Sequence, residues 1–458
     1  MSMTLGRLAA TPLLLLSALG FAADDDWPRW RGPNDDGVAR TPAPVQWSDT
    51  ANIAWKAEIP GRGHSSPVIW GNRLFLTTAV PKSDTPPAAE PPKPPGGVAP
   101  GGPGGPGGRR GGAGGGAAAG REHDLLVICL DRNTGKTLWQ KTARTVKPHE
   151  GYHNRYGSFA SNSPVTDGKR LFAFFGSHGL FVYDLDGKLL WEKSFEPMSM
   201  RMAFGEGVAP VLDGNSLYLK FDHERGSYML ALDARDGKQL WRVERDEGSS
   251  WSQPYVTTVN GKKQVIVAAT TKIRAYEPET GKVIWECAGL GANVIPAPVR
   301  IDDIVIVMSG YRDPNLLAIR LGRTGDLTGT DAIVYSNNRG NSYTPSPVLS
   351  DGKLYFVSDN GLLTCLNART GEAYYRQQRL SKASSFKASP VAAGEHLYLA
   401  TENGDVVVVK LGEKYEEVAV NTLTDQMFIA TPAIAGGSLY LRGQNTLFCI
   451  RDAKVAAR

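Results

Sequence analysis

The stretch of sequence that decides the fold runs from residue 346 to residue 375 and reads SPVLSDGKLYFVSDNGLLTCLNARTGEAYY. A Pro-Val start leads into a turn at Asp351-Gly352, and an apolar run that begins with Leu-Tyr follows it. An Asp-Gly pair between two apolar runs is a strong signal for a tight hairpin. Another apolar run comes next, then a turn at Thr370-Gly371, and then Tyr375. This unit therefore predicts four short antiparallel strands joined by tight turns.

The same unit recurs along the chain, and each copy starts with a proline. The prolines of the eight starts are Pro67, Pro164, Pro210, Pro254, Pro298, Pro347, Pro390 and Pro432. Successive starts lie 42 to 49 residues apart, except for the first interval of 97, which contains an insertion. Four strands in a period of about 40 to 50 residues are typical of a β-propeller blade. The chain is therefore expected to be an all-β protein, an eight-bladed propeller of four-stranded antiparallel blades.

The two ends of the repeat array predict how the ring closes. The last unit ends with the strand pattern of residues 447–450 and has no fourth strand of its own. Residues 53–56, which precede the first start, carry the fourth-strand pattern Ile-Ala-Trp-Lys. We expect this N-terminal strand to complete the last blade, which would remove the exposed sheet edge of an open array.

Tryptophan recurs at the fourth strand of most units. The tryptophans at this position are Trp55, Trp139, Trp191, Trp241 and Trp285. A large indole that recurs once per blade favours packing between blades over an aromatic ligand site. Tyr335 and Tyr375 stand at this position in units five and six. Cys129, Cys365 and Cys449 share a third-strand position where other units have alanine, so we expect buried free thiols.

Two segments lie outside the repeat. Residues 1–22 have Arg7, an apolar run and the small residues Gly20 and Ala22, which is the pattern of a cleaved signal peptide. The alternative, an anchored helix, is disfavoured because the run is short and interrupted. Residues 81–120 contain 10 prolines and 14 glycines and predict a disordered insertion in blade 1. We therefore expect an exported propeller over residues 23–458, periplasmic or extracellular, with no integral membrane segment after cleavage and no lipoprotein anchor.

Composition narrows the function classes. The chain has 51 basic and 46 acidic side chains, so the net charge of +5 is small for 458 residues and argues against a nucleic-acid partner. The four cysteines form no Cys-x-x-Cys pair, which leaves a thiolate zinc site and a c-type haem unsupported. We expect a monomer that binds a protein or peptide partner.

The candidate ligand site is a ring of polar and aromatic residues, one per blade, just ahead of the repeat prolines. Loops at these positions converge on one mouth of a propeller channel. The ring comprises His64, Asn162, Glu206, Trp251, Asn293, Tyr343 and Lys387, with Met427 or Phe428 in the eighth blade. Glu206 and Lys387 would face each other across an eight-membered ring and could clasp a ligand, or they could be ordinary polar loop ends. The clusters at residues 149–155 and 222–225 mix histidine with charged residues but match no metal-ligand spacing, so we expect solvated loops there.

The repeat resembles a known family. A Leu-Tyr pair, a Cys-Leu-Asp segment and a Thr-Gly-Lys-x-Leu-Trp turn, as in residues 129–139, are similar to the pyrroloquinoline quinone (PQQ) repeat. The opening Trp-Pro-Arg-Trp-Arg-Gly-Pro-Asn of residues 27–34 also resembles the start of exported bacterial PQQ-like propellers. The resemblance covers almost the whole chain outside the insertion and implies the propeller fold.

The resemblance leaves three functions open, because this superfamily holds both enzymes and scaffolds. The first expectation is a non-catalytic protein-binding scaffold of the cell envelope, with no catalytic residue, metal or cofactor. The second is a quinone-dependent alcohol or sugar dehydrogenase that uses PQQ with calcium. That alternative lacks the adjacent cysteine pair found in such enzymes, and their catalytic residues match no position here. The third is an outer-membrane protein assembly factor of the BamB type, although the anchoring cysteine of that lipoprotein is absent.

Overall fold

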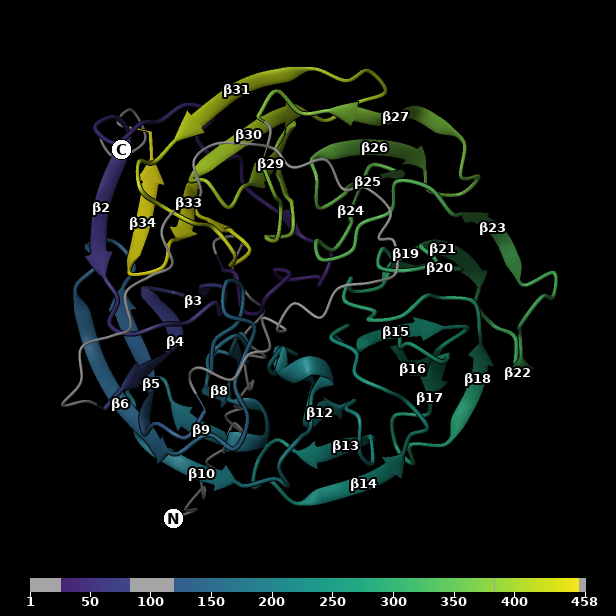
Figure 1. Ribbon diagram of the computed structural model, residues 1–458, viewed down its shortest axis with the longest axis horizontal. Helices are drawn as coiled ribbons and strands as arrows, with labels where there is room; N and C mark the ends of the chain where they lie inside the picture. Colours follow the sequence, from purple (N-terminus) through teal and green to yellow (C-terminus); the bar gives the residue numbers. More distant parts are fainter. Residues whose placement is uncertain (1–25, 83–118, 383, 453–458) are drawn as a thin grey trace, which may run out of the picture.

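The fold was obtained as a computed structural model that describes residues 26–82, 119–382 and 384–452. The predicted signal peptide and most of the predicted insertion therefore lie outside the described residues. The described chain forms a ring of eight twisted sheets around a central axis, with almost no helix (Figure 1). The eight-bladed propeller predicted from the repeat is confirmed.

Each blade contains four antiparallel strands, given from the axis outward. Blades 1 to 4 are built from β3 (Val68–Trp70), β4 (Arg73–Pro81), β5 (His123–Asp131) and β6 (Thr137–Val146); β7 (Val165–Thr166), β8 (Arg170–Phe174), β9 (Leu180–Asp184) and β10 (Leu189–Lys193); β11 (Val211–Asp213), β12 (Ser216–Phe221), β13 (Tyr228–Asp233) and β14 (Gln239–Glu244); and β15 (Tyr255–Val259), β16 (Lys262–Val267), β17 (Ile273–Tyr276) and β18 (Val283–Cys287).

The second half of the ring repeats this arrangement. Blades 5 to 8 are built from β19 (Val299–Ile301), β20 (Ile304–Ser309), β21 (Asn315–Arg320) and β23 (Ile333–Asn337); β24 (Val348–Ser350), β25 (Lys353–Val357), β26 (Leu362–Asn367) and β27 (Ala373–Arg379); β28 (Val391–Ala393), β29 (His396–Ala400), β30 (Asp405–Lys410) and β31 (Glu417–Thr422); and β32 (Ala433–Ala435), β33 (Ser438–Arg442) and β34 (Thr446–Arg451), followed by β2 (Ile53–Glu58) from the N-terminal part of the chain.

Strand β2 closes the ring as predicted. It pairs antiparallel with β34, and Trp55 lies opposite Cys449 in this pairing. Two blades also gain a fifth strand that the repeat did not predict. β1 (Val38–Ala39) pairs in parallel with the innermost strand β28, and β22 (Gly325–Asp326) pairs in parallel with the outermost strand β18. The Asp351-Gly352 turn has positive φ at both residues, 47° and 70°, as a two-residue hairpin of the favoured type requires.

The core lies between neighbouring blades. The second and third strands are buried on both faces because each blade is covered by the next, whereas the outermost strands alternate between buried and exposed residues. One apolar cluster joins Phe172 and Phe174 of blade 2 to Leu217 and Leu219 of blade 3. Burial between blades therefore holds the ring together.

The fourth-strand tryptophans contact the next blade. The indole Nε1 of Trp139 donates to Leu185 O at 3.0 Å, and that of Trp241 donates to Pro278 O at 2.7 Å. The ring of Trp139 lies against Gly187 of the following turn, where an added Cβ would come within 2.8 Å of it. Trp285 differs, because its Nε1 donates to Gln264 of its own blade. All four cysteines of the chain are buried and unpaired.

The N-terminal segment of residues 27–37 passes along the inside of the ring, drawn in purple in Figure 1. Pro28 O accepts a bond from Thr166 N of blade 2, and Trp30 Nε1 donates to Thr431 Oγ1 of blade 8 at 2.9 Å. The buried Arg31 donates to Pro390 O of blade 7 at 3.0 Å and to Pro347 O of blade 6 at 2.6 Å. This segment, the axial plug, therefore links blade 2 to blades 6, 7 and 8 across the ring.

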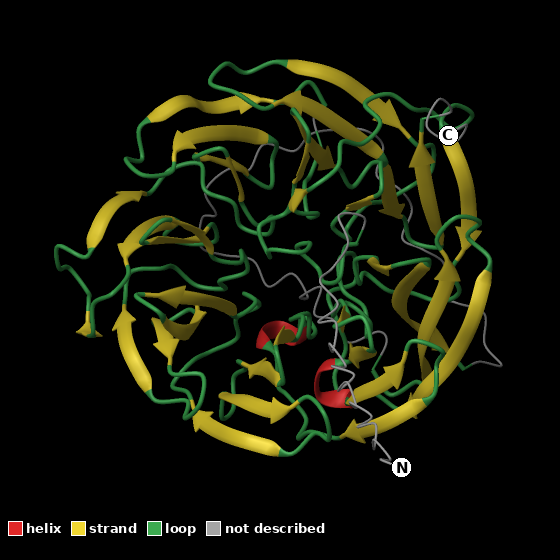
Figure 2. Ribbon diagram, turned by 180° about the vertical axis from the view of Figure 1, so that it is seen from behind, coloured by secondary structure: helices red, strands yellow, loops and turns green. Residues whose placement is uncertain are grey.

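Two short 3-10 helices lie beside the channel, η1 (Gly176–His178) and η2 (Arg201–Ala203) (Figure 2). η1 is the turn between β8 and β9, and η2 precedes β11. Among the described residues, no helix has the length and apolar character needed to cross a bilayer.

Candidate functional site

The sequence-predicted ring residues lie in the loops that lead into the innermost strands. Three of them, His64, Asn162 and Asn293, are buried. Glu206, Trp251, Tyr343 and Lys387 are partly exposed, as is Met427, whereas Phe428 is buried. We call the face of the ring that carries these loops the mouth face.

A single long loop, residues 148–161, covers part of the mouth face. We call it the covering loop. Arg62 of blade 1 donates to Asn154 O and Arg155 O at 2.7 and 3.0 Å. Arg155 pairs with Glu402 of blade 7 at 2.8 Å. The loop follows blade 1 in the chain and contacts blade 7, so it spans the mouth instead of projecting into solvent.

The proposed clasp between Glu206 and Lys387 is not formed, because each side chain has a different partner. Lys387 pairs with Asp359, and its ammonium lies 4.8 Å from the ring centroid of Tyr156 in the covering loop. Glu206 accepts hydrogen bonds from Ser177 of η1. The ring therefore divides into a paired half around blades 6 and 7 and a separate acidic part at blades 2 and 3.

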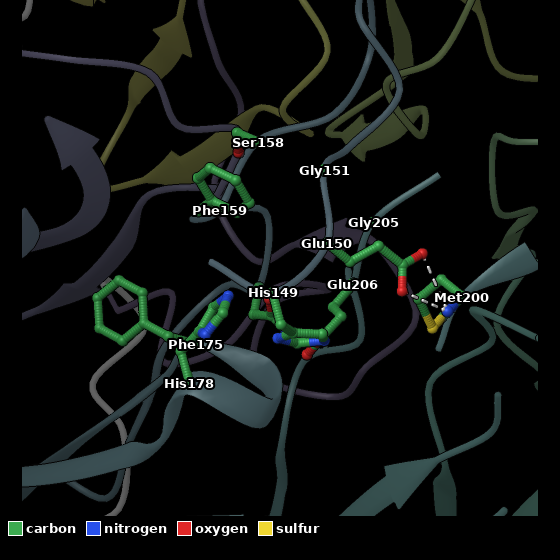
Figure 3. Close-up of a pocket in the computed structure, with 11 residues that line it drawn as sticks. His149, Glu150, Gly151, Ser158, Phe159, Phe175, His178, Met200, Gly205 and Glu206 are labelled. Carbon is green, nitrogen blue, oxygen red and sulfur yellow. Dashed lines mark hydrogen bonds between the residues drawn. The ribbon is translucent and has the colours of Figure 1, made fainter. Parts of the chain in front are cut away.

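The acidic part surrounds a cavity between blades 2 and 3, shown in Figure 3. Its lining residues are His149, Glu150, Gly151, Ser158, Phe159, Asn162, Phe175, His178, Met200, Gly205 and Glu206. They come from the covering loop, from η1 and from the segment around η2.

Glu206 is held in this cavity by η1. One carboxylate oxygen accepts from Ser177 N at 2.5 Å and the other from Ser177 Oγ at 2.6 Å. Gly176 has φ of 61°, and an added Cβ would come within 1.7 Å of the carboxylate, so glycine is required for this approach. Burial raises the pKa of Glu206 to about 7, and the two bonds from Ser177 oppose that rise.

The other titratable groups of the cavity lie on the covering loop and η1. Both oxygens of Glu150 accept from Met200 N, at 3.0 and 3.2 Å, and burial raises the pKa of this carboxyl group. His149 Nε2 lies 2.7 Å from Met198 O, to which it donates. Burial lowers the pKa of His178 to about 4, so its imidazole is neutral at neutral pH. The cavity wall thus carries two carboxyl groups and neither lysine nor arginine.

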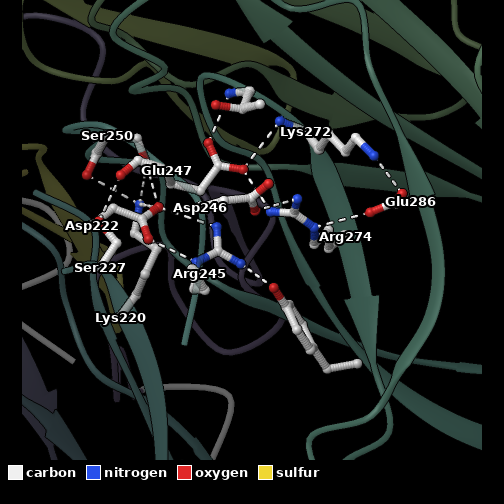
Figure 4. Close-up of polar contacts among 12 residues, drawn as sticks. Lys220, Asp222, Ser227, Arg245, Asp246, Glu247, Ser250, Lys272, Arg274 and Glu286 are labelled. Atoms are coloured by element: carbon white, nitrogen blue, oxygen red, sulfur yellow. Dashed lines mark hydrogen bonds and ion pairs between the residues drawn. The ribbon is translucent and has the colours of Figure 1, made fainter. Parts of the chain in front are cut away.

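A second hollow shares Asn162, Met200 and Glu206 with this cavity and leads to a buried ionic network (Figure 4). Asp222 accepts from Arg245 at 2.7 Å, and Lys220 lies 3.4 Å from the same carboxylate. Lys220 also donates to Ser250 O and Oγ, at 3.1 and 2.6 Å, so its ammonium protons are satisfied. Burial lowers the pKa of Lys220 to about 8. These groups are arranged as a structural network.

Two sequence expectations about loops hold only in part. Residues 222–225 were expected in a solvated loop. Glu224 and Arg225 are exposed, but the Asp222 side chain is fully buried against Arg245 and Lys220. Residues 149–155 were also expected to be solvated, whereas Glu150 is partly buried in the cavity and Arg155 reaches blade 7. Strand spacing does not reveal which loop crosses the mouth, and no sequence signal marked Ser177 as the partner of Glu206.

The donor groups at the mouth do not fit PQQ with calcium. No group of three or more histidine, cysteine, aspartate or glutamate side chains within the described ranges could hold a metal ion. PQQ is a tricarboxylate, and the charged groups of the cavity wall are themselves carboxyl groups. The nearby cations Lys387 and Arg155 are engaged by Asp359 and Glu402. We therefore derive no reaction step through a quinone.

Comparison with known proteins gives one family. The family model described as outer membrane protein assembly factor BamB matches three overlapping ranges, residues 123–371, 201–416 and 347–456. BamB of Moranella endobia is 24% identical over 272 residues, which cover 55% of this chain and 66% of that protein. BamB of Yersinia pestis is 21% identical over 290 residues, covering 62% of this chain and 59% of that protein. The matches thus span less than two thirds of these relatives.

Solved structures share the fold at low identity. BamB from Moraxella catarrhalis superposes with a TM-score of 0.53 at 14% identity, covering 71% of this chain and 93% of that structure. Quinohemoprotein alcohol dehydrogenase from Comamonas testosteroni gives a TM-score of 0.59 at 12% identity, covering 93% of this chain and 81% of that structure. At such identities the likeness concerns the propeller alone.

Proposed function

Because the chain belongs to the PQQ-like propeller family described as outer membrane protein assembly factor BamB, we propose that it is a non-catalytic, protein-binding propeller of the cell envelope that takes part in outer-membrane protein assembly. The observation that carries this proposal is the family match over residues 123–456. The relatives named BamB support the same direction. We further propose that the protein is exported and needs no quinone cofactor.

The mouth face is the proposed docking surface. Met202 of η2 is 60% exposed and has φ of 52°, and Ala203 has the same φ. Residues other than glycine are strained in this left-handed region, and such strain is concentrated at functional sites. Phe204 follows two residues after Met202, and its ring centroid lies 6.5 Å from that of Trp251. Exposed apolar side chains and aromatic rings are enriched in protein-binding surfaces.

The outermost strands are the alternative docking surface. Leu138, Leu190 and Leu240 are each about half exposed and precede the blade tryptophans. Since they recur at the same repeat position in three blades, we attribute them to the repeat itself. The mouth face, by contrast, is not the same in every blade, because the covering loop and η2 each occur at only one place in the described ring. Such a non-repeating surface suits recognition of a specific partner.

Photo-crosslinking in the native cell tests the proposal. A photoreactive amino acid is placed at Met202 on the mouth face or at Leu240 on an outermost strand, and crosslinked proteins are identified by mass spectrometry. We expect the Met202 position to capture a component of the outer-membrane protein assembly machinery and the Leu240 position to capture none. Absence of any such component from both positions would overturn the proposed function, and its capture only at Leu240 would overturn the choice of face.

A further inference from the structure

The cavity between blades 2 and 3 contains two carboxyl groups with no cationic partner. Neither Glu150 nor Glu206 forms an ion pair within the part of the chain that the structure describes. Neighbouring buried carboxylates behave differently, because Asp222 pairs with Arg245 and Glu247 pairs with Arg274, both at 2.7 Å. A buried carboxylate without a counter-charge is costly, so a cation entering this cavity gains from both groups.

The fold holds one of these carboxyl groups against the cavity wall. Gly176 leaves the space, and the N–H and hydroxyl of Ser177 fix both oxygens of Glu206. Glu206 as a whole residue is partly exposed, and it lines both this cavity and the neighbouring hollow. A fixed, accessible acceptor of this kind is suited to binding a ligand, because little conformational freedom is lost on binding.

The remaining wall determines which cation fits. The described residues offer no third acidic, histidine or cysteine group in metal-binding geometry. Met200 lies beside the carboxylate of Glu150, and Phe159 and Phe175 form the apolar part of the wall on the far side of His149 and His178 (Figure 3). Apolar side chains and aromatic rings accommodate the aliphatic stem and charged head of an organic cation. A compact ammonium on a methylene stem matches this wall better than a planar guanidinium, which favours a bidentate carboxylate with both oxygens free.

We infer that this cavity is a pocket for one primary ammonium group on an aliphatic stem, the side chain of a lysine in a bound protein. The source of the lysine rests on the proposed function, since a docked partner would present it at the mouth face. The ammonium would donate hydrogen bonds to Glu206 and Glu150, and its stem would lie along Met200. The inference assigns to the pocket the recognition of one basic residue in the partner.

Calorimetric titration with Nα-acetyl-lysine amide tests the pocket without any partner protein. We expect saturable binding of one molecule per chain. Binding to Glu206→Gln is expected to be about tenfold weaker, because a charge-assisted hydrogen bond is lost. Glu196→Gln, which removes an exposed carboxylate outside the cavity lining, serves as the matched control and should bind as the wild type does. The Nε-acetylated probe, which has lost its charge, should not bind.

Proton release gives a second readout. Binding of the ammonium requires ionised Glu206, so affinity should rise between about pH 6 and pH 8, with proton uptake by the buffer. The groups that face Glu206 are Glu150 and His149 on the covering loop, His178 on η1, Lys220 on β12, and Asp222 directly after that strand. This pH dependence should disappear in Glu206→Gln but persist in Glu196→Gln.

Any of three results with the lysine probe would overturn the inference. These are the absence of saturable binding, equal binding by wild type and Glu206→Gln, and equal binding of the Nε-acetylated probe. Tight calcium binding with loss of the lysine site would also contradict it and would assign the cavity to a metal. The proposed function can fail separately, because loss of crosslinks to assembly components would leave the binding of the small probe unchanged.

Discussion

The buried carboxyl group of Glu206 predicts an unusual pH dependence of stability. Burial raises the pKa of this group from an ordinary 4.5 to about 7 in the folded protein. Below about pH 4.5 the group is protonated in both the folded and the unfolded state, so it contributes no difference there. As the pH rises toward 7 the unfolded chain ionises freely while the folded protein resists ionisation. The wild-type protein therefore loses stability, relative to a variant with a neutral side chain at position 206, as the pH rises from about 4.5 to about 7.

The magnitude follows from the size of the shift. One pKa unit corresponds to about 1.4 kcal/mol, so the rise in the pKa from 4.5 to about 7 implies at most about 3 to 4 kcal/mol above pH 7. This is an upper bound because Glu206 also faces the cavity and is partly solvated. Glutamine keeps one acceptor oxygen for Ser177 and carries no charge. Glu206→Gln should therefore be more stable than the wild type at pH 8, by about 1 to 3 kcal/mol, and nearly equal to it at pH 4.5.

Urea unfolding measured between about pH 4.5 and pH 8 checks this prediction. The difference in unfolding free energy between Glu206→Gln and wild type should grow with pH and level off above about pH 8. Glu196→Gln, at an exposed position, should give a curve parallel to that of the wild type. If the Glu206→Gln curve also runs parallel to the wild type, the carboxyl group is not buried in the folded protein and the cavity argument loses its basis.

Three further predictions concern the ring and the cofactor. Trp241→Ala should destabilise the fold by about 3 to 5 kcal/mol in urea unfolding, because it empties an interblade contact and leaves Pro278 O without a donor. The exposed neighbour Leu240→Ala should change stability by less than about 1 kcal/mol, and equal losses would refute the packing role. Arg31→Met should cost about 3 kcal/mol, because carbonyl oxygens of two blades lose their donor, and an unchanged unfolding midpoint would show that the axial plug does not hold the ring. PQQ with calcium should leave the unfolding temperature of the protein unchanged. A ligand that binds the folded state adds about 2.7 kcal/mol of stability at a hundredfold excess over its Kd. A clear rise in the unfolding temperature would therefore contradict the absence of a quinone site.

The fold could be predicted from the sequence because its determinants repeat. Each blade buries its strands against the next, so the same Pro-apolar start, hairpin turn and closing aromatic residue must recur. The closing strand β2 was visible for the same reason, since Ile53 to Lys56 carried a pattern missing at the other end. The extra strands β1 and β22 were not visible, because two-residue pairings leave no periodic signal.

The candidate site was predicted only in part. The repeat position located Glu206 and Asn162, which do line the cavity. It did not locate Glu150 or Ser177, because the covering loop and η1 occur in single blades and follow no period. The eightfold repeat predicted that Lys387 faces Glu206 across the ring. In the structure Lys387 instead pairs with Asp359 of the adjacent blade. Non-repeating loops determine the chemistry of this site, and their path depends on tertiary contacts.

Hydrogen-exchange mass spectrometry of the protein bound to its captured assembly partner tests the central claim most directly. A docked partner should slow exchange in the loops of the mouth face, in the covering loop and in residues 199–207, and leave the outermost strands such as β14 unchanged. Protection confined to the outermost strands, with the covering loop and η2 exchanging as in the free protein, would contradict binding at the mouth face.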